Sequence, residues 1–237
     1  MSDEPETTTS DFWKGLWKNG DIGWHRNEVN AFLIKYFDEL TGGRSNLRFF
    51  VPLSGKSVDM LWLADKGHTV VGVELAKQAN EDFFAENNLT FTVESVEMSA
   101  VSEPVEVYKC TEKKITIFCC DLFAMTENDV GGRFDAIWDR GSLSAIAPSF
   151  GDRGKRYTTK MHSLLASGGN YLLESCYYEV DRGMNPPASI PDEQINEMYE
   201  EHFTIKKLEV NKIQPNLDIK LSFALDMKHY LFKPKVN

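Results

Sequence analysis

Gly55 and Glu74 are the residues whose types and spacing most directly suggest chemistry. Glu74 follows an apolar run, 69–73. It lies 19 residues after Gly55, which is in a small turn behind an apolar run that stops at Pro52. At this separation a strand–helix–strand unit places an acid against the ribose of a nucleotide-type ligand. A carboxylate accepts hydrogen bonds from both hydroxyls of a vicinal diol. The pair therefore predicts an adenosine-type ligand.

The turn around Gly55 also limits the kind of ligand. The Gly-x-Gly-x-x-Gly fingerprint of dinucleotide sites is absent, because Gly55 is the only glycine of the turn. The triplet Gly55, Lys56, Ser57 resembles the end of a P-loop, but that motif needs a glycine where Phe50 stands. A ligand with a ribose and no phosphate remains, and S-adenosylmethionine is the commonest candidate. A purely structural crossover without a ligand is the alternative.

Composition and charge restrict the partners of the chain. Its 237 residues carry a formal net charge of −10 and show no basic cluster interleaved with aromatic residues, so we expect no nucleic-acid partner. With 42% hydrophobic residues, the chain is long enough to bury one core. We expect a single domain over 11–237 behind a disordered polar tail over 1–10, and a monomer that acts on a small molecule.

The cysteines and the apolar runs bear on the compartment. The four cysteines lack zinc-ligand spacing and a secretory pattern, which predicts reduced structural thiols and no metal site; they are Cys110, Cys119, Cys120 and Cys176. The amino terminus lacks the features of a signal or transit peptide. No apolar run approaches the ~18 residues of a membrane span. We therefore expect a cytoplasmic protein without a membrane partner.

Alternating strands and helices must position the chemical groups. Apolar runs that end at Pro52, Glu74, Asp121 and Asp139 are typical of buried strands, with helical stretches between them. This alternation predicts an α/β fold with a mostly parallel sheet that helices cover on both faces. The carboxyl ends of such strands share one edge, which brings the loops 53–55, 74–75, 121–122 and 139–140 together. We expect a strand over 89–93 and a loop over 96–114 with one short strand around 105–108. We also expect 204–210 to pair antiparallel with 221–225.

Several segments together resemble the thiopurine S-methyltransferase family. They are the pair Trp13 and Trp17, the crossover RFFVPLSGKSVDMLWLADKGHTVVGVE, the segment CCDLF and the segment FDAIWDRGSL, within a likeness from about Trp13 to about Pro191. The resemblance implies a Rossmann-like, doubly wound sheet of seven strands with an antiparallel last pair. It also implies methyl transfer from S-adenosylmethionine to the sulfur of aromatic or heterocyclic thiols such as 6-mercaptopurine, a reaction of xenobiotic metabolism.

The resemblance assigns the methionine and ribose ends of the cofactor site. Trp13 and Trp17 would lie on an amino-terminal helical lid that folds over the cofactor. Leu53 and Gly55 would supply backbone contacts to the methionine portion. Glu74 would accept from the ribose diol, as its position alone also indicates.

The remaining positions implied by the resemblance lie around the adenine and the acceptor. Leu75 would line the ribose neighbourhood, and Asp121 and Leu122 would flank the adenine. Arg140 would lie at the boundary between cofactor and acceptor, where its charge could stabilise a thiolate. Trp24 would pack against the flat acceptor.

The residues by themselves leave structural explanations open. Trp13 and Trp17 at helical spacing also suit core packing. Asp121 could cap a following helix, and Asp139 could cap a helix or form a local ion pair with Arg140. A lone histidine such as His25 beside a helix start is more often structural than catalytic.

One departure from the family pattern concerns the acceptor. Family members carry an arginine before the final strands, whereas 214–220 contains none, and only Lys220 could replace its charge. A lysine lacks the planar fork that grips a heterocycle at two points. Other small thiols, thiocyanate or chalcogenides are therefore alternative acceptors. An oxidoreductase on a similar fold and a non-catalytic binding protein are the alternatives from other functional classes.

Overall fold

The computed structural model describes residues 9–146, 149–182, 186–215 and 222–235. Its helices are α1 (Ser10–Asn19), α2 (Ala31–Lys35), α3 (Phe37–Thr41), α4 (Asp59–Asp65), α5 (Lys77–Glu86), the short 3₁₀ helix η2 (Leu122–Ala124), α6 (Ser142–Ala145), α7 (Arg153–Leu164) and α8 (Asp192–Tyr199). Its strands are β1 (Arg48–Val51), β2 (Thr69–Val73), β3 (Phe91–Val96), β4 (Val105–Cys110), β5 (Ile115–Phe118), β6 (Phe134–Arg140), β7 (Leu165–Tyr177), β8 (Phe203–Ile213) and β9 (Leu225–Pro234).

The strands form one mixed sheet whose centre is parallel. The order is β3-β4-β5-β2-β1-β6-β7-β9-β8, a nine-stranded sheet. Strands β5, β2, β1, β6 and β7 run parallel, as the crossovers predict. At the two ends, β4 and β3 and then β9 and β8 run antiparallel to their neighbours.

The seven-stranded sheet implied by the resemblance was wrong, because the sheet has nine strands and the segment after α5 forms a hairpin at one edge. β3 and β4 pair from Phe91 with Cys110 to Val96 with Val105, although most of β3 is exposed to solvent. The expected strands over 89–93 and around 105–108 correspond to β3 and β4, which the structure extends to Val96 and to Cys110. The antiparallel last pair is present, but the expected partner 221–225 was wrong: Thr204 pairs with Lys233 and Val210 with Lys228, because β9 runs from Leu225 to Pro234.

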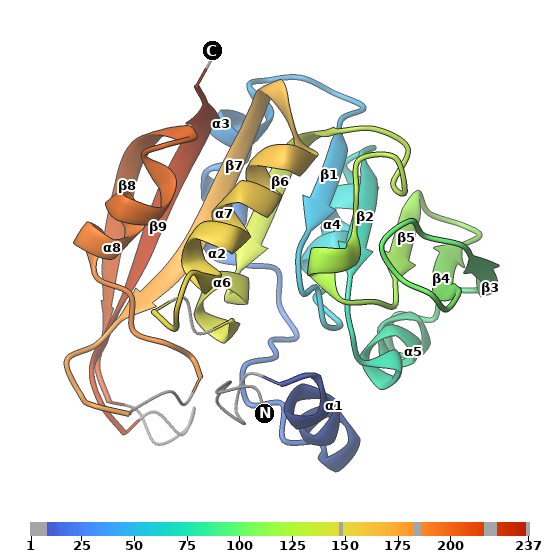
Figure 1. The fold of residues 1–237 in the computed structure, drawn as a ribbon, viewed down its shortest axis with the longest axis horizontal. Coiled ribbons are helices and arrows are strands. Elements are labelled where there is room, and N and C mark those ends of the chain that lie inside the picture. The colour runs from blue at the N-terminus through green and yellow to red at the C-terminus, as the bar shows by residue number, and fades with distance from the viewer. Residues whose placement is uncertain (1–8, 147–148, 183–185, 216–221, 236–237) are drawn as a thin grey trace.

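Helices cover both faces of the sheet and produce two cores. Phe50 lies in a core on the face of α6, α7 and α8, whereas its neighbour Phe49 lies in a second core with Met60 and Leu63 of α4. Figure 1 shows α7 and α8 in front of the sheet and α2, α3 and α4 behind it. Side chains of successive strand residues point to opposite faces, so one apolar run supplies both cores. Each fully buried large side chain stabilises the fold by roughly 1.5–3 kcal/mol.

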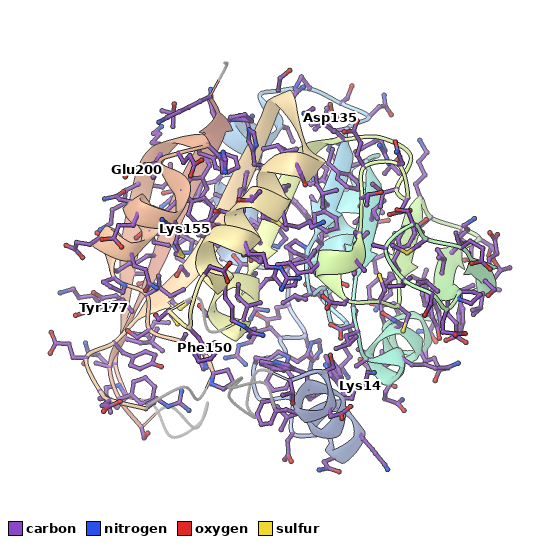
Figure 2. The ribbon with its side chains drawn as sticks, viewed as in Figure 1. Lys14, Asp135, Phe150, Lys155, Tyr177 and Glu200 are labelled. Atoms are coloured by element: carbon purple, nitrogen blue, oxygen red, sulfur yellow. The ribbon has the colours of Figure 1, made fainter. Side chains whose placement is uncertain are left out.

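The parallel strands end at one edge of the molecule. Asp135, near the start of β6, and Tyr177, the last residue of β7, mark opposite ends of these strands (Figure 2). α1 lies at the carboxyl-terminal edge (Figure 1). Thr9 caps this helix through a hydrogen bond from the Phe12 amide at 3.2 Å, and Gly20 ends it in the left-handed conformation with φ of 74°. In the part of the chain described, no helix is long and apolar enough to cross a bilayer.

Candidate active site

Glu74 is fixed at the carboxyl end of β2 by the turn that faces it. Its side chain is 7% exposed. Oε2 accepts from the Gly55 amide at 2.9 Å, and Oε1 accepts from the Ala76 amide at 2.8 Å. Burial raises the pKa of Glu74, and the hydrogen bonds from Ala76 and Gly55 oppose that shift. Each carboxylate oxygen keeps a lone pair for a further donor.

The turn between β1 and α4 requires unusual backbone conformations. Leu53 and Gly55 both have positive φ, of 42° and 51°. Only glycine adopts this region freely, so Leu53 is held there by its surroundings. The Ser54 amide donates to the Val73 carbonyl at 2.9 Å, which joins the turn to the end of β2. Ser57 then accepts from the Asp59 amide at 3.3 Å and helps α4 to begin.

α1 packs directly on this turn. A Cβ atom at Gly55 would lie 3.1 Å from Cζ2 of Trp17, so only glycine allows the indole to sit there undisturbed. Trp17 is buried in a small cluster with Ala76 and Ala79, separate from the two main cores. The helix therefore covers the end of β2, which agrees with a lid and also with simple packing.

Tryptophan rings gather between α1 and the following segment. The Trp24 ring lies 5.4 Å from that of Trp13 and 6.0 Å from that of Trp17, both edge to face. Trp24 is 39% exposed. The three indoles, Trp13, Trp17 and Trp24, form what we call the tryptophan cluster.

Arg140 joins the sheet to the tryptophan cluster. It is the last residue of β6, and its Nη2 donates to the Trp24 carbonyl at 3.2 Å. Its Nε lies 3.4 Å from Oε1 of Glu174, so the guanidinium is held from both sides. Burial and the charge of Arg140 lower the pKa of Arg26 nearby. His25 is half-buried in the same segment, and burial together with Lys56 lowers its pKa.

Leu75, Asp121 and Leu122 follow β2 and β5 at the same edge. The Glu74 amide donates to the Phe118 carbonyl at 3.0 Å, which keeps the two strand ends adjacent. Asp121 is exposed, and its Oδ1 accepts from the Phe123 amide at 2.8 Å, so it caps η2. Leu122 is buried, and Leu75 is half-buried. The capping alternative for Asp121 is therefore present, and its contact with an adenine stays a prediction.

Asp139 is a buried structural carboxylate. Its Oδ2 accepts from the hydroxyls of Tyr157 and Tyr171, both at 2.6 Å, and Oδ1 accepts from the Ser142 amide at the start of α6. The Tyr199 hydroxyl lies 2.8 Å from that of Tyr171. Burial raises the pKa of Asp139, and these hydrogen bonds oppose the shift. We call these three tyrosines and Asp139 the tyrosine cluster. The N-cap residue of α6 is Gly141, and Asp139 accepts from the first amide of this helix without occupying the cap position.

The sequence prediction missed a set of polar residues beneath the amino-terminal segment. Glu174 contacts Arg140, accepts from Asn30 Nδ2 at 2.9 Å, and lies 3.0 Å from Nε2 of His229. Asp59 accepts from the Asn30 amide at 2.8 Å. Glu174 follows a buried apolar run just as Glu74 does, and Asn30 directly precedes a helix. The sequence pattern could therefore have indicated an acid near a strand end and a helix cap at these two positions. His229 carried none.

The cysteines give no sign of a reactive or metal-binding group. All four are free thiols. Burial raises the pKa of Cys119 to about 11 and that of Cys120 to about 12, so both stay protonated at neutral pH. Across residues 9–146, 149–182, 186–215 and 222–235, no group of three or more histidine, cysteine or acidic side chains could hold a metal ion. Lys220, the possible replacement for the family arginine, lies outside the described residues.

Comparisons with known proteins agree on one family. A family model described as Thiopurine S-methyltransferase (TPMT) matches residues 8–230. Thiopurine S-methyltransferase of Rattus norvegicus is 39% identical over 81% of this chain and 77% of its own length. The Canis lupus familiaris enzyme of the same name is 37% identical over 96% of this chain and 90% of its own.

A solved structure supports the fold at lower sequence identity. The 1,6-didemethyltoxoflavin-N1-methyltransferase of Burkholderia thailandensis, with bound 1,6-didemethyltoxoflavin and S-adenosylhomocysteine, aligns with a TM-score of 0.61 at 16% identity. The alignment covers 100% of this chain and 94% of that protein. Since the sheet, the turn held by Glu74 and the extent of the family match agree, the chain belongs to the thiopurine S-methyltransferase family and is an S-adenosylmethionine-dependent S-methyltransferase.

Proposed function

We propose that the acceptor is an aromatic or heterocyclic thiol such as 6-mercaptopurine, methylated on its sulfur. The observation that carries this proposal is the position of Arg140, held between Glu174 and the Trp24 carbonyl next to the tryptophan cluster. An arginine beside indole rings favours a flat acceptor that bears negative charge on sulfur. The chain as a whole is acidic, with a net charge of −10, whereas Arg140 and the nearby Arg26 make this edge locally cationic.

The turn held by Glu74 supports the proposed place of the cofactor. Both Glu74 oxygens are fixed by backbone amides and retain lone pairs, which suits the two hydroxyls of a ribose. Leu53 and Gly55 would contact the methionine portion through their backbone, which the positive φ angles orient away from ordinary strand geometry.

The adenine and the cover of the site complete the proposed arrangement. Asp121 and Leu122 would flank the adenine, and Leu75 would line the ribose from the loop after β2. Trp13 and Trp17 would close the site from α1, where Trp17 already contacts the turn at Gly55.

Methyl transfer depends more on aligning the acceptor sulfur with the methyl group than on moving a proton. S-adenosylmethionine supplies a methyl group activated by its sulfonium, and the protein has to hold the acceptor sulfur in line with it and exclude water. Arg140 would stabilise the thiolate form of the acceptor, because a fixed cation lowers the pKa of a nearby thiol. An acceptor that binds as a thiolate needs no general base, and we assign none.

A second group of acceptors is favoured by one observation. Residues 214–220 contain no arginine, which removes a planar cation from the acceptor side. Small thiols, thiocyanate or chalcogenides need less contact than a heterocycle, so they are the alternative substrates. We also propose a single domain, a monomeric state, a cytoplasmic location and a role in the metabolism of foreign thiols, all from the sequence.

The test is transfer of a labelled methyl group to 6-mercaptopurine, thiophenol, thiocyanate and hydrosulfide. Glu74→Gln should weaken S-adenosylmethionine binding about 10- to 100-fold, since a hydrogen bond to a charged group is lost. Glu94→Gln, on exposed β3, is the matched control and should behave as wild type. Turnover of only thiocyanate and hydrosulfide would replace the aromatic acceptor with the second group. Unchanged cofactor affinity in Glu74→Gln would refute the proposed ribose contact.

A further inference from the structure

Arg140, Glu174 and His229 stand side by side on three adjacent strands. Arg140 of β6 is in register with Glu174 of β7, which is in register with His229 of β9. Their side chains touch in the same order, at 3.4 Å between Arg140 Nε and Glu174 Oε1 and 3.0 Å between His229 Nε2 and Glu174 Oε2. We call these three residues the cross-strand row. Its far end, His229, is fully buried, and its near end, Arg140, reaches the tryptophan cluster.

Asn30 attaches the amino-terminal segment to this row. Its side-chain amide donates to Glu174 at 2.9 Å, and its side-chain oxygen accepts from the Phe32 and Leu33 amides at the start of α2. Its own amide donates to Asp59 at 2.8 Å. The segment between α1 and α2 is therefore anchored at Asn30 and again at the Trp24 carbonyl, which Arg140 holds. Glu174 contacts both residues that hold the segment, Asn30 and Arg140.

The electrostatics of Glu174 favour an ionised carboxylate. Burial alone would raise the pKa of Glu174, but hydrogen bonds from His229 and Asn30 and the charge of Arg140 outweigh it, and the pKa lies below its ordinary value. One Glu174 oxygen serves Asn30 and His229, and the other faces Arg140. Arg26 is the other cation that interacts with this carboxylate.

A purely stabilising role explains this arrangement poorly. A buried ionic group costs several kcal/mol of desolvation, and apolar residues of similar size often give equal or higher stability. The row also ends at the partly exposed Arg140, although an apolar residue at this strand end would have been enough for stability alone. A carboxylate that fixes the direction of a guanidinium accounts for both features.

We propose that Glu174 is a positioning residue that, with Asn30 and His229, aims Arg140 at the acceptor sulfur and couples that orientation to docking of the amino-terminal segment. The inference rests on the proposed function, because it needs Arg140 to face the acceptor. Glu174 itself touches no reacting atom. It acts through Arg140, so its effect should vanish when Arg140 is absent.

A double-mutant cycle with Glu174→Gln and Arg140→Ala tests this dependence. Glu174→Gln should lower kcat for 6-mercaptopurine about 10- to 100-fold, as supporting residues of a site do. It should also move the rise of kcat with pH to higher pH, because the thiolate is less stabilised. The dissociation constant of S-adenosylhomocysteine should stay within about twofold, since the Glu74 turn is untouched and the introduced amide can still accept from Asn30 and keep the segment docked. In the Arg140→Ala background, Glu174→Gln should change kcat by less than about twofold.

Two results would overturn the inference while leaving the proposed function in place. One is Arg140→Ala with reduced kcat but Glu174→Gln with the kcat and pH profile of wild type. The other is an equal loss from Glu174→Gln in both backgrounds. Wild-type kcat and pH profile in Arg140→Ala would instead refute the role of Arg140, and with it this inference.

Controls separate positioning from loss of folding. Asp192→Asn removes another carboxylate that binds Lys228 and Tyr230, but from α8 on the other face of the sheet, and it should keep the wild-type pH profile. If Glu174→Gln does not fold, His229→Gln keeps a hydrogen-bond donor near Glu174 and should shift the same profile by a smaller amount. A wild-type profile in a folded His229→Gln together with full activity of Glu174→Asp would count against the proposal.

Discussion

Asp139 and Glu174 are buried carboxylates on neighbouring strands, yet their surroundings differ in kind. Asp139 lies in the tyrosine cluster, where neutral hydroxyls and one amide donate to it, and burial raises its pKa. Glu174 lies in the cross-strand row, where burial is outweighed by hydrogen bonds from His229 and Asn30 and by the charge of Arg140, so its pKa is lowered. The partners therefore decide the state of the carboxylate more than the depth of burial does.

We expect the difference to separate a structural region from the region proposed to act in catalysis. The tyrosine cluster joins β6 and β7 to α7 and α8 and has no member at the tryptophan cluster. The cross-strand row begins on the same strands but leads to Arg140 and the amino-terminal segment. Mutations in the first should cost stability with little change in catalysis, and mutations in the second should do the reverse.

Asp139→Ala is expected to have the largest effect on stability. It leaves the hydroxyls of Tyr157 and Tyr171 without their acceptor inside the protein, at a cost of about 3 kcal/mol or more. Urea unfolding measures the loss. Asp152→Ala, an exposed residue before α7 whose side chain makes no capping hydrogen bond, should change stability by less than about 0.5 kcal/mol. Equal losses in the two variants would contradict a special role for the tyrosine cluster.

Glu174→Gln should cost less stability than Asp139→Ala and more activity. The amide can still accept from Asn30, so we expect a loss of about 1–2 kcal/mol in urea unfolding. The fall in kcat should be larger than this loss explains, because the enzyme remains folded under assay conditions. If Glu174→Gln were as unstable as Asp139→Ala but had normal kcat, the cross-strand row would be structural like the tyrosine cluster, and the distinction between the two regions would fail.

Tyr199→Phe tests whether the tyrosine cluster contributes to stability without affecting catalysis. Tyr171 already donates its proton to Asp139, so Tyr199 donates to Tyr171, and the change removes one neutral hydrogen bond. We expect a loss of about 1 kcal/mol in unfolding free energy. kcat and the cofactor affinity should equal those of wild type, and a change in either would link the tyrosine cluster to the site.

The pH dependence of stability should show the smallest effect, with opposite signs for the two carboxylates. The raised pKa of Asp139 means that its contribution is full below the ordinary value of 3.8 and is lost as pH rises through the folded pKa. The lowered pKa of Glu174 means that its contribution is present above the ordinary value of 4.5 and is lost as pH falls through the folded pKa.

Unfolding free energies from about pH 3 to about pH 8 check these signs. The stability difference between wild type and Asp139→Asn should fall as pH rises above 3.8. The difference between wild type and Glu174→Gln should fall as pH drops below 4.5. The same slope in both variants would show that the two environments do not differ as described.

The parts of the fold that local pattern controls could be predicted. The turn at Gly55, the helix behind it and the acid at Glu74 follow each other in one crossover, and the apolar runs of β1 and β2 mark its strands. The helical spacing of Trp13 and Trp17 likewise predicted α1. These features depend on residues close in the chain, where periodicity and turn chemistry act.

The parts that depend on distant pairing could not be predicted. His229 reaches Glu174 across 55 residues, and only the pairing of β7 with β9 brings them together. The strands of the β3–β4 hairpin were expected over 89–93 and around 105–108, but their full length and their pairing were not, since the exposed residues of β3 do not form an apolar run. The contact between Arg140 and the Trp24 carbonyl could not be predicted either, because every residue has a backbone carbonyl and the sequence does not indicate which one accepts.

The hydrogen bond between Gly55 and Glu74 has a consequence for discrimination among adenosine compounds. In phosphate-binding turns the backbone N–H at this position would point at the ligand. Here the Gly55 N–H already donates its hydrogen bond to the Glu74 carboxylate. A nucleoside triphosphate or a dinucleotide would lack this donor for its phosphates. A sulfonium compound carries positive charge and needs no such donor. In the proposed site the turn would therefore offer a phosphate one donor fewer, so we expect the methyl donor to be favoured over phosphorylated nucleotides that carry the same ribose.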